Sequence, residues 1–468
     1  MPVADPEKTS PRASLWPVII SSFKGETRDY TTETLQRSIL FLAVPMVLEM
    51  AMESIFALAD VFWVSRLGSD AVAVVGLTES IMTIIYAVAI GLAMAGAAIV
   101  ARRVGERDDE EAARSSVQVI LLGFAVALGL GVVGICFGPS LLRAMGASDR
   151  VLELGSNFSR IMIGGNVTVT MIFLINAIFR GAGDAVVAMR TLIFANTLNI
   201  VLGPLLIFGF GFGVTGAAMA TNIGRGCGVL YQLYHLAVRP GRIRIARRHF
   251  VFEPDVVWSI LRVGSVGIFQ NVIGMTSWIG LVRILSQFGS SALAGYTIAI
   301  RLVIFALLPA WGLSNAGATL VGQNLGAKRP DRAESAVWMA VRYNVIFLGI
   351  IGLLFIVLSA PITWLFAQDL EAHGYATQAL WVIALGFPFY AAGMCMTSAF
   401  NGAGDTWTPT RLNLACFWLF EIPFAWWLAD KLSQGPSGVF IAITCAFSLL
   451  AIGGLILFRR GAWKAVLV

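Results

Sequence analysis

The chain has 468 residues, of which 57% are hydrophobic and only 13% are charged. A water-soluble domain carries about 25% charged residues, so a soluble chain of this size would lack the charged groups needed to cover its surface. The mean hydropathy of +0.80 and the 48 glycines instead suit helices that pack closely in a membrane. The five cysteines lie in apolar stretches without paired spacing, which argues against a disulfide framework or a metal site.

Apolar stretches of the length needed to cross a bilayer, about 20 residues, recur twelve times along the chain. A polar tail, residues 1–37, precedes the first lobe of six predicted helices, residues 38–238. A basic linker, residues 239–256, leads to a second six-helix lobe, residues 257–458, and a short tail, residues 459–468. The twelve predicted spans lie at about 38–64, 71–101, 115–138, 156–179, 186–208, 212–238, 257–285, 292–322, 335–366, 377–400, 407–429 and 437–458. The sequence therefore predicts an all-α membrane protein.

The two halves repeat each other at an offset of 221 residues. Gly181-Ala-Gly-Asp184 falls on Gly402-Ala-Gly-Asp405, and Ala95-Gly-Ala97 falls on Ala316-Gly-Ala318. Each half holds an even number of spans, so both enter the membrane in the same direction. This predicts two six-helix lobes that are parallel repeats, related by a pseudo-twofold axis along the membrane normal.

The distribution of Lys and Arg predicts the orientation, because cytoplasmic segments are enriched in both. With the N-terminus inside, 23 of the 33 basic residues lie in inner segments, four in outer loops and six within spans or at their ends. We therefore expect a multi-pass protein of the inner (plasma) membrane with both termini cytoplasmic. Membrane insertion accounts for the net charge of +6, so no nucleic-acid partner is expected.

Several motifs resemble those of the multidrug and toxic compound extrusion (MATE) family. They include residues 59–68, Ala-Asp-Val-Phe-Trp-Val-Ser-Arg-Leu-Gly, residues 321–327, Val-Gly-Gln-Asn-Leu-Gly-Ala, and residues 199–208, Asn-Ile-Val-Leu-Gly-Pro-Leu-Leu-Ile-Phe. The resemblance covers residues 38–458. It implies a transporter of two six-helix lobes that exports organic, mainly cationic and lipophilic compounds in exchange for H⁺ or Na⁺.

Three acidic residues, Glu49, Glu53 and Asp60, lie in the first predicted span. At 100° per residue they share one face of a helix. A charged side chain in the bilayer core costs about 2.5–3.5 kcal/mol on insertion scales, so this face must point into the lobe or into a wet cavity. We expect Glu49 and Glu53 to face the same cavity as Asp60. The alternative is that protonated acids form hydrogen bonds that only pack the helices together.

The resemblance assigns ion coupling to Asp60, with Asn199 and Thr221 as its polar partners. One branch of the family has a second carboxylate four residues after the Asn, where this chain has Gly203. Glu49 or Glu53 could supply the missing charge, and the sequence does not decide between them. It also leaves H⁺ and Na⁺ both open as the coupling ion, with no other cofactor expected.

The second lobe has fewer polar candidates. Where another branch carries acids on its seventh helix, this chain has Gln270 and Asn271. Glu421 is the one deep acid of this lobe, two residues before Pro423, and it either binds a cationic substrate or holds a kink at that proline. These three residues complete the possible ion or substrate site, while coupling is expected in the first lobe.

A gate on the outer side is predicted from Glu79 and Arg301. They lie on repeat-related helices, one position apart in the repeat register, so the pseudo-twofold axis places them at nearly the same depth in opposite lobes. A charge in apolar surroundings needs a partner. We expect the two to approach each other when the outer side is closed; alternatively, each is satisfied within its own lobe.

Two other functions remain as alternatives to drug/ion antiport. A lipid or lipid-linked-precursor flippase would line its cavity with several cations, whereas Arg160, Arg225, Arg262 and Arg342 are placed near predicted span ends. A polytopic membrane enzyme would need a metal or nucleophile cluster, which the sequence does not indicate, so the chain is not expected to be an enzyme. We expect a monomer in the lipid bilayer that binds small organic, cationic substrates.

Overall fold

The computed structural model describes residues 21–23, 25, 28–239, 241–366 and 369–466. Most of the predicted N-terminal tail and the last two residues of the C-terminal tail therefore lie outside the described residues. The described part is helical and contains no strand. Ten helical segments in it are long and apolar enough to cross a bilayer, and the bent pair α12–α13 makes eleven. The remaining long helix, α8, carries buried Thr221, Arg225 and Gln232 in its middle and second half.

The first lobe consists of α2 to α8. Its helices are α2 (Leu35–Ser65), α3 (Ser69–Gly105), α4 (Asp109–Ala144), α5 (Asp149–Gly164), α6 (Asn166–Ala182), α7 (Ala185–Pro204) with the π-helical turn η1 (Leu205–Gly209), and α8 (Val214–Ala237). The short helix η2 (Arg247–His249) lies in the linker. The predicted span at 156–179 is thus two helices that meet at Gly165.

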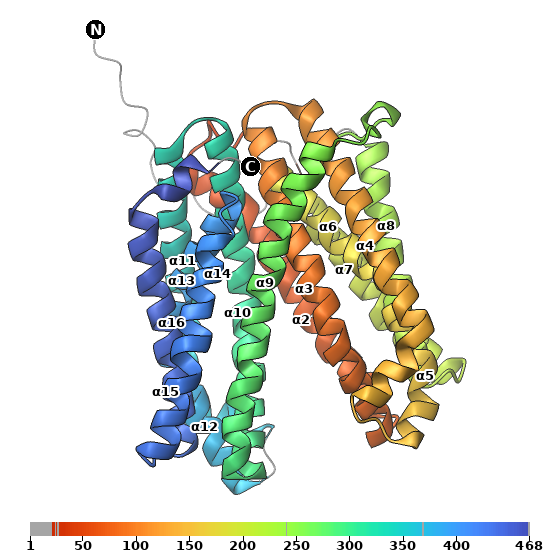
Figure 1. The fold of residues 1–468 in the computed structure, drawn as a ribbon, viewed down its shortest axis with the longest axis vertical. Coiled ribbons are helices and arrows are strands. Elements are labelled where there is room, and N and C mark those ends of the chain that lie inside the picture. Colours follow the sequence, from red (N-terminus) through yellow and green to blue (C-terminus); the bar gives the residue numbers. More distant parts are fainter. Residues whose placement is uncertain (1–20, 24, 26–27, 240, 367–368, 467–468) are drawn as a thin grey trace.

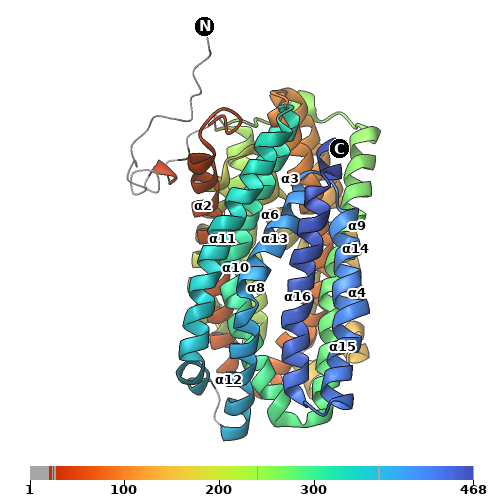
Figure 2. The same ribbon diagram turned by 90° about the vertical axis from the view of Figure 1, so that its left-hand side faces the viewer.

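The second lobe repeats this order. It comprises α9 (Pro254–Leu285), η3 (Ser286–Phe288), α10 (Ser290–Gly326), α11 (Pro330–Trp364), α12 (Leu370–Leu385), α13 (Phe387–Gly402), α14 (Trp407–Asn413), η4 (Leu414–Glu421), α15 (Ile422–Trp426), η5 (Trp427–Lys431), α16 (Pro436–Arg459) and η6 (Ala462–Ala465). The pair α12–α13 bends by 56° at Gly386, as α5 and α6 break at the equivalent place. In Figure 2 the long helices of this lobe run along the long axis of the molecule.

The lobes meet through α2, α3, α9 and α10, where α3 packs on α9 and α10 packs on both α2 and α3. Figure 1 shows the ribbons of the two lobes together at the end that holds the C-terminus and diverging toward the opposite end. We call these the termini end and the distal end. Methyl groups added to Gly76 on α3 and to Gly274 on α9 would have no neighbour within 4 Å among the described residues, consistent with this divergence.

A glycine seam, formed by Gly91, Gly105, Gly312 and Gly326, joins the lobes toward the termini end. A methyl group on Gly91 would lie 2.5 Å from the backbone nitrogen of Ile268, and one on Gly312 would lie 2.5 Å from the backbone oxygen of Met46 and 2.9 Å from the nitrogen of Val47. Methyl groups on Gly105 and Gly326 would overlap the backbone oxygens of Gln323 and Arg102 respectively.

These contacts are paired by the 221-residue offset. Gly91 and Gly312 are repeat mates, as are Val47 and Ile268, so one contact is the image of the other. The same holds for Gly105 on Gln323 and Gly326 on Arg102. The seam therefore obeys the parallel pseudo-twofold symmetry predicted from the sequence.

Two segments that precede the lobes clasp the termini end. The terminal clasp, residues 28–33, accepts hydrogen bonds at the Thr31 oxygen from Arg329 Nη1 (2.8 Å) and at the Tyr30 and Glu33 oxygens from Arg332. Both arginines lie at the start of α11, in the second lobe. The Tyr30 hydroxyl donates to Gly183 O in the first lobe at 3.1 Å, so this clasp bridges the lobes.

The linker clasp, residues 248–253, makes the reciprocal contacts. Gln118 Nε2 donates to Val251 O at 2.6 Å, and Glu110 lies 2.7 Å from Arg248 Nη2 and 2.9 Å from His249 Nε2. Glu110 and Gln118 belong to the first half of α4, in the first lobe. Each lobe's leading segment thus holds the start of the helix equivalent to α4 in the opposite lobe.

Candidate functional site

Glu49 lies in the closed interior of the first lobe. It is fully buried, at 0% exposure, and its Oε1 accepts hydrogen bonds from Asn176 Nδ2 at 3.0 Å and Arg180 Nη1 at 3.2 Å, both on α6. Asn176 in turn accepts a hydrogen bond from Gln232 on α8. If it is ionised, a fully buried carboxylate needs such a charged partner, since desolvation is otherwise too costly.

Glu53 lies one turn further along α2 and is bound by a second arginine. Arg225 Nη2 on α8 lies 2.8 Å from Glu53 Oε1, and Asn196 Nδ2 on α7 donates to Oε2 at 3.1 Å. Arg225 is 3% exposed, and its guanidinium carbon is 5.3 Å from the Phe56 ring centroid. The predicted common face of α2 therefore points into the lobe.

Arg225 is the centre of a larger electrostatic cluster. Besides Glu53, it lies within electrostatic range of Asp60 on α2 and Glu79 on α3. No hydrogen bond or ion pair of either carboxylate is found among the described residues. Together with Glu49 the cluster has four carboxylates and two guanidiniums, so four ionised acids would leave an excess of two negative charges.

The residues expected around Asp60 are only partly brought together. Asn199 Nδ2 donates to Thr221 Oγ1 at 3.0 Å, and both are buried, but neither is hydrogen-bonded to Asp60 in the described chain. At Gly203, where a second carboxylate was missing, a methyl group would meet Trp63 Cδ1 at 3.5 Å. Trp63 of α2 thus occupies the space beside that position, and the roles of Glu49 and Glu53 as replacements stay predictions.

Gln270 and Asn271 lie on α9 at the lobe interface. Gln270 is 9% exposed, and its Oε1 is buried without a hydrogen-bond partner among the described residues. Asn271 Nδ2 donates to Gly267 O at 2.8 Å and lies 3.7 Å from Met94 Sδ on α3 of the other lobe. Asn271 therefore contacts α3 of the first lobe, and a role of either residue in ion or substrate binding stays a prediction.

Glu421 lies in the interior of the second lobe, at the end of the π-helical segment η4. It is 2% exposed and lines a small cavity that is otherwise apolar and aromatic, with Trp278, Tyr296, Tyr390 and Phe447 among its walls. No cationic partner of Glu421 is found in the described residues. Substrate binding and kink formation both remain open as its role, because the residue combines a break in helix geometry with an unpaired acid.

The two predicted gate residues are not paired in this structure. Glu79 faces the first-lobe cluster, with Asp60, Arg225 and Glu53 as its charged neighbours, whereas the Arg301 side chain is exposed. The lobes diverge at the distal end in Figure 1, so their approach in a state closed at that end stays a prediction.

The expectation that Arg225 lies near a span end is wrong. It is the twelfth residue of the 24-residue helix α8 and is buried. Its position at the midpoint of the predicted 212–238 span was the sequence signal that indicated a buried arginine. Arg160, Arg262 and Arg342 are exposed. In the described interior of the first lobe, Arg180 and Arg225 are both paired with acids.

This arrangement is that of a two-lobe membrane transporter: repeat-related helix bundles meet at one end, and ionisable side chains lie inside them, most of these in the first lobe. The MatE family model matches residues 45–205 and 267–427, once in each lobe. The chain therefore belongs to the multidrug and toxic compound extrusion family, as its motifs indicated. Members of this family are transporters of small organic compounds, not enzymes.

Relatives and solved structures agree along nearly the whole chain. It is 25% identical over 448 residues to the probable multidrug resistance protein YoeA of Bacillus subtilis, covering 94% of this chain and 96% of that protein. It is 27% identical to the probable multidrug resistance protein NorM of Caulobacter vibrioides, over 91% of this chain and 92% of that one. A multidrug resistance MATE family transporter solved in an outward-facing conformation superposes with a TM-score of 0.89 at 26% identity, covering 95% of this chain and 99% of that one.

Proposed function

We propose that this protein exports small organic cations from the cell by alternating access, driven by proton entry through the first-lobe carboxylates. The observation that carries the proposal is that a single guanidinium, Arg225, serves three acids. It is bound to Glu53 at 2.8 Å and lies within range of Asp60 and Glu79. Protons that bind here remove an excess of negative charge that the lobe does not otherwise balance.

Exchange of partners around Arg225 gives the cluster two arrangements. When Asp60 is ionised it competes with Glu53 for the guanidinium, and when it is protonated Arg225 stays with Glu53. Because α2 carries both acids and also packs against α10 of the other lobe, a shift in this balance acts on a helix that joins the lobes. This is the bistable element that a coupled transporter requires.

The geometry favours H⁺ over Na⁺ as the coupling ion. Sodium, a hard cation, needs several oxygen ligands that converge, and in the described residues the Asp60 carboxylate makes no hydrogen bond to Asn199 or Thr221. The Thr221 hydroxyl already accepts a hydrogen bond from Asn199, and Arg225 would repel a second cation close to Asp60. A proton needs only one carboxylate oxygen.

The substrates we propose are cationic. The first lobe has an excess of acids, and the second lobe adds Glu421 beside the aromatic rings of Tyr296 and Tyr390. Aromatic faces attract cations. We place the termini end in the cytoplasm, because the basic residues gather in segments at that end. We further propose that the protein is a monomer in the plasma membrane.

The test is dye transport by the purified protein in liposomes. A cationic fluorescent dye is the substrate, and a pH gradient alone or a Na⁺ gradient alone is imposed. We expect accumulation of the dye under the pH gradient and only leakage under the Na⁺ gradient. Transport driven by Na⁺ alone at constant pH would overturn the choice of ion, and transport of neutral or anionic analogues at the same rate would overturn the choice of substrate.

A further inference from the structure

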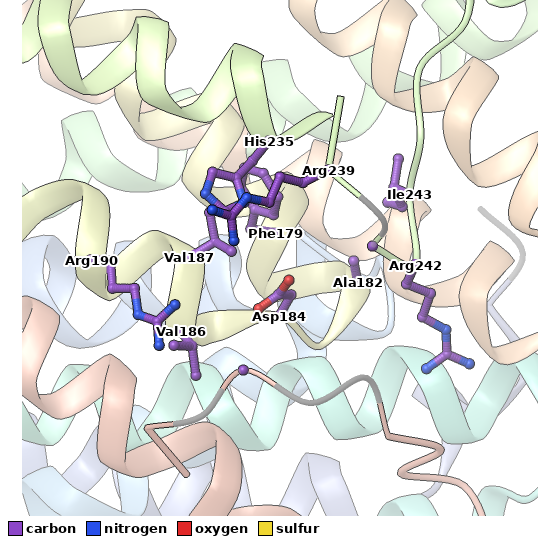
Figure 3. Close-up of a pocket in the computed structure, with 12 residues that line it drawn as sticks. Phe179, Ala182, Asp184, Val186, Val187, Arg190, His235, Arg239, Arg242 and Ile243 are labelled. Carbon is purple, nitrogen blue, oxygen red and sulfur yellow. The ribbon is translucent and has the colours of Figure 1, made fainter. Parts of the chain in front are cut away.

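A basic pocket lies at the termini end, outside the site described above. It forms where the turn between α6 and α7 meets the end of α8 and the linker (Figure 3). Its polar walls are Asp184, Arg190, His235, Arg239 and Arg242. In Figure 3 Asp184 lies between Arg190 of α7 and two arginines of the linker, Arg239 and Arg242.

The charges of the pocket do not balance. Three guanidiniums and one carboxylate line the pocket, and Arg242 Nε also lies 3.8 Å from Asp109 Oδ1 outside it, which leaves an excess of one positive charge with His235 counted as neutral. Arg190 Nη2 donates to the Phe23 oxygen at 2.7 Å, and Arg242 Nη1 donates to the Arg28 oxygen at 3.0 Å. These acceptors are uncharged backbone oxygens. Arg239 is exposed, and no hydrogen bond or ion pair of its side chain is found among the described residues.

The pocket opens beside an apolar helix surface. One turn further from the termini end, Phe194 follows Arg190 on α7, and Tyr231 precedes His235 on α8. The rings of Phe194 and Tyr231 are 6.1 Å apart, and those of Tyr231 and His235 are 4.6 Å apart. Phe194 is 47% exposed and Leu230 is 67% exposed, so on these two helices apolar groups adjoin the basic ones at the depth where a span begins.

We propose that this pocket binds the phosphate of an anionic phospholipid headgroup, with the acyl chains along the exposed faces of α7 and α8. Guanidiniums bind phosphate oxygens through paired hydrogen bonds, and basic pockets at the ends of membrane helices recognise anionic headgroups. The adjoining apolar surface distinguishes a lipid from free phosphate, because only a lipid contacts both. The ligand would join α7 and α8 to the linker that leads into the second lobe.

The test compares lipids on the purified full-length protein. The thermal unfolding midpoint and the lipid retained in native mass spectra are measured with phosphatidylglycerol, phosphatidylcholine or inorganic phosphate added. We expect the midpoint to rise with phosphatidylglycerol, and apparent affinity for it to fall about fivefold for each arginine removed. Arg239→Gln is the first variant, since no described contact of its side chain is lost, and Arg190→Gln/Arg239→Gln is the second.

Arg244→Gln is the matched control, because Arg244 is an exposed arginine of the same linker that does not line the pocket. It removes the same charge and should retain phosphatidylglycerol as the unmodified protein does. Equal losses in Arg244→Gln and Arg239→Gln would overturn the proposal, since the effect would then be one of net charge. Stabilisation by phosphatidylcholine or by inorganic phosphate equal to that by phosphatidylglycerol would overturn the assignment to an anionic lipid.

Discussion

The glycine seam predicts that one methyl group changes the balance between transport states. In Gly91→Ala the new methyl would lie 2.5 Å from the nitrogen of Ile268 and 2.9 Å from the oxygen of Gly264, both backbone atoms of α9 in the opposite lobe. Ordinary carbon contacts are about 3.5–4.0 Å. Helices α3 and α9 would therefore have to separate locally by roughly 1 Å to restore an ordinary contact distance.

The magnitude follows from the cost of such overpacking, about 1–3 kcal/mol. The contact exists while the lobes are joined at the termini end and is relieved when they part there. The whole cost therefore acts on the equilibrium between states, which corresponds to a shift of about 5–150-fold. Gly76→Ala on the same helix is the control, because nothing lies within 4 Å of its new methyl.

The assay is a distance measurement between spin labels at Asp149 and Leu370, in a background with the native cysteines replaced. These repeat mates are exposed, and they are the first residues of helices α5 and α12 at the distal end. We expect Gly91→Ala to increase the population with short distances, as the distal ends approach, and Gly76→Ala to leave the distribution unchanged. Identical distributions for the two variants would refute the reasoning.

The site, the clasps and the basic pocket each give one further prediction. Arg225→Met should lower the free energy of unfolding by about 3–5 kcal/mol, because Glu53 loses its buried partner. Adding Glu53→Gln should restore much of this loss. Unfolding midpoints that fall additively in the double variant would count against the ion pair. Arg329→Gln removes the charge-assisted bond to Thr31, worth about 1.5–3 kcal/mol, and should favour parting of the termini end in the same spin-label assay, whereas Lys328→Gln should not. Burial raises the pKa of Asp184 to about 6 despite its backbone contact with Val187 and the nearby Arg190. An anion in the pocket is repelled by ionised Asp184, so phosphatidylglycerol should bind more tightly as the pH falls from about 7 to 5 through this pKa, and a pH dependence unchanged in Asp184→Asn would contradict this.

The fold was predictable because lipid imposes few solutions on an apolar chain. Twelve apolar stretches, the 221-residue repeat and its parallel sense were readable from the sequence, and the symmetric contacts of Gly91 and Gly312 bear out the register. The breaks were missed. Hydropathy does not distinguish one straight span from two helices that meet at Gly165 or Gly386, since both bury the same apolar residues.

The sequence predicted which face of the first helix carries the acids, but not which side chains these acids bind. Helical periodicity placed Glu49 and Glu53 on the interior side of α2 because an acid cannot point toward lipid. Which cation each would meet depends on how α6 and α8 pack against α2, and this packing pairs Arg180 with Glu49 and Arg225 with Glu53. Sequence spacing does not predict such contacts, because they join residues that are 131 and 172 positions apart in the chain.

The central claim, that Asp60 couples proton movement to export, is tested most directly by Asp60→Asn in liposomes. Two rates are measured on the same preparation: accumulation of a cationic dye under a pH gradient, and exchange of labelled for unlabelled dye without a gradient. We predict that accumulation is lost while exchange persists, because substrate can still be carried when the proton-binding carboxylate is absent. Gradient-driven accumulation by Asp60→Asn at the rate of the unmodified protein would contradict the claim.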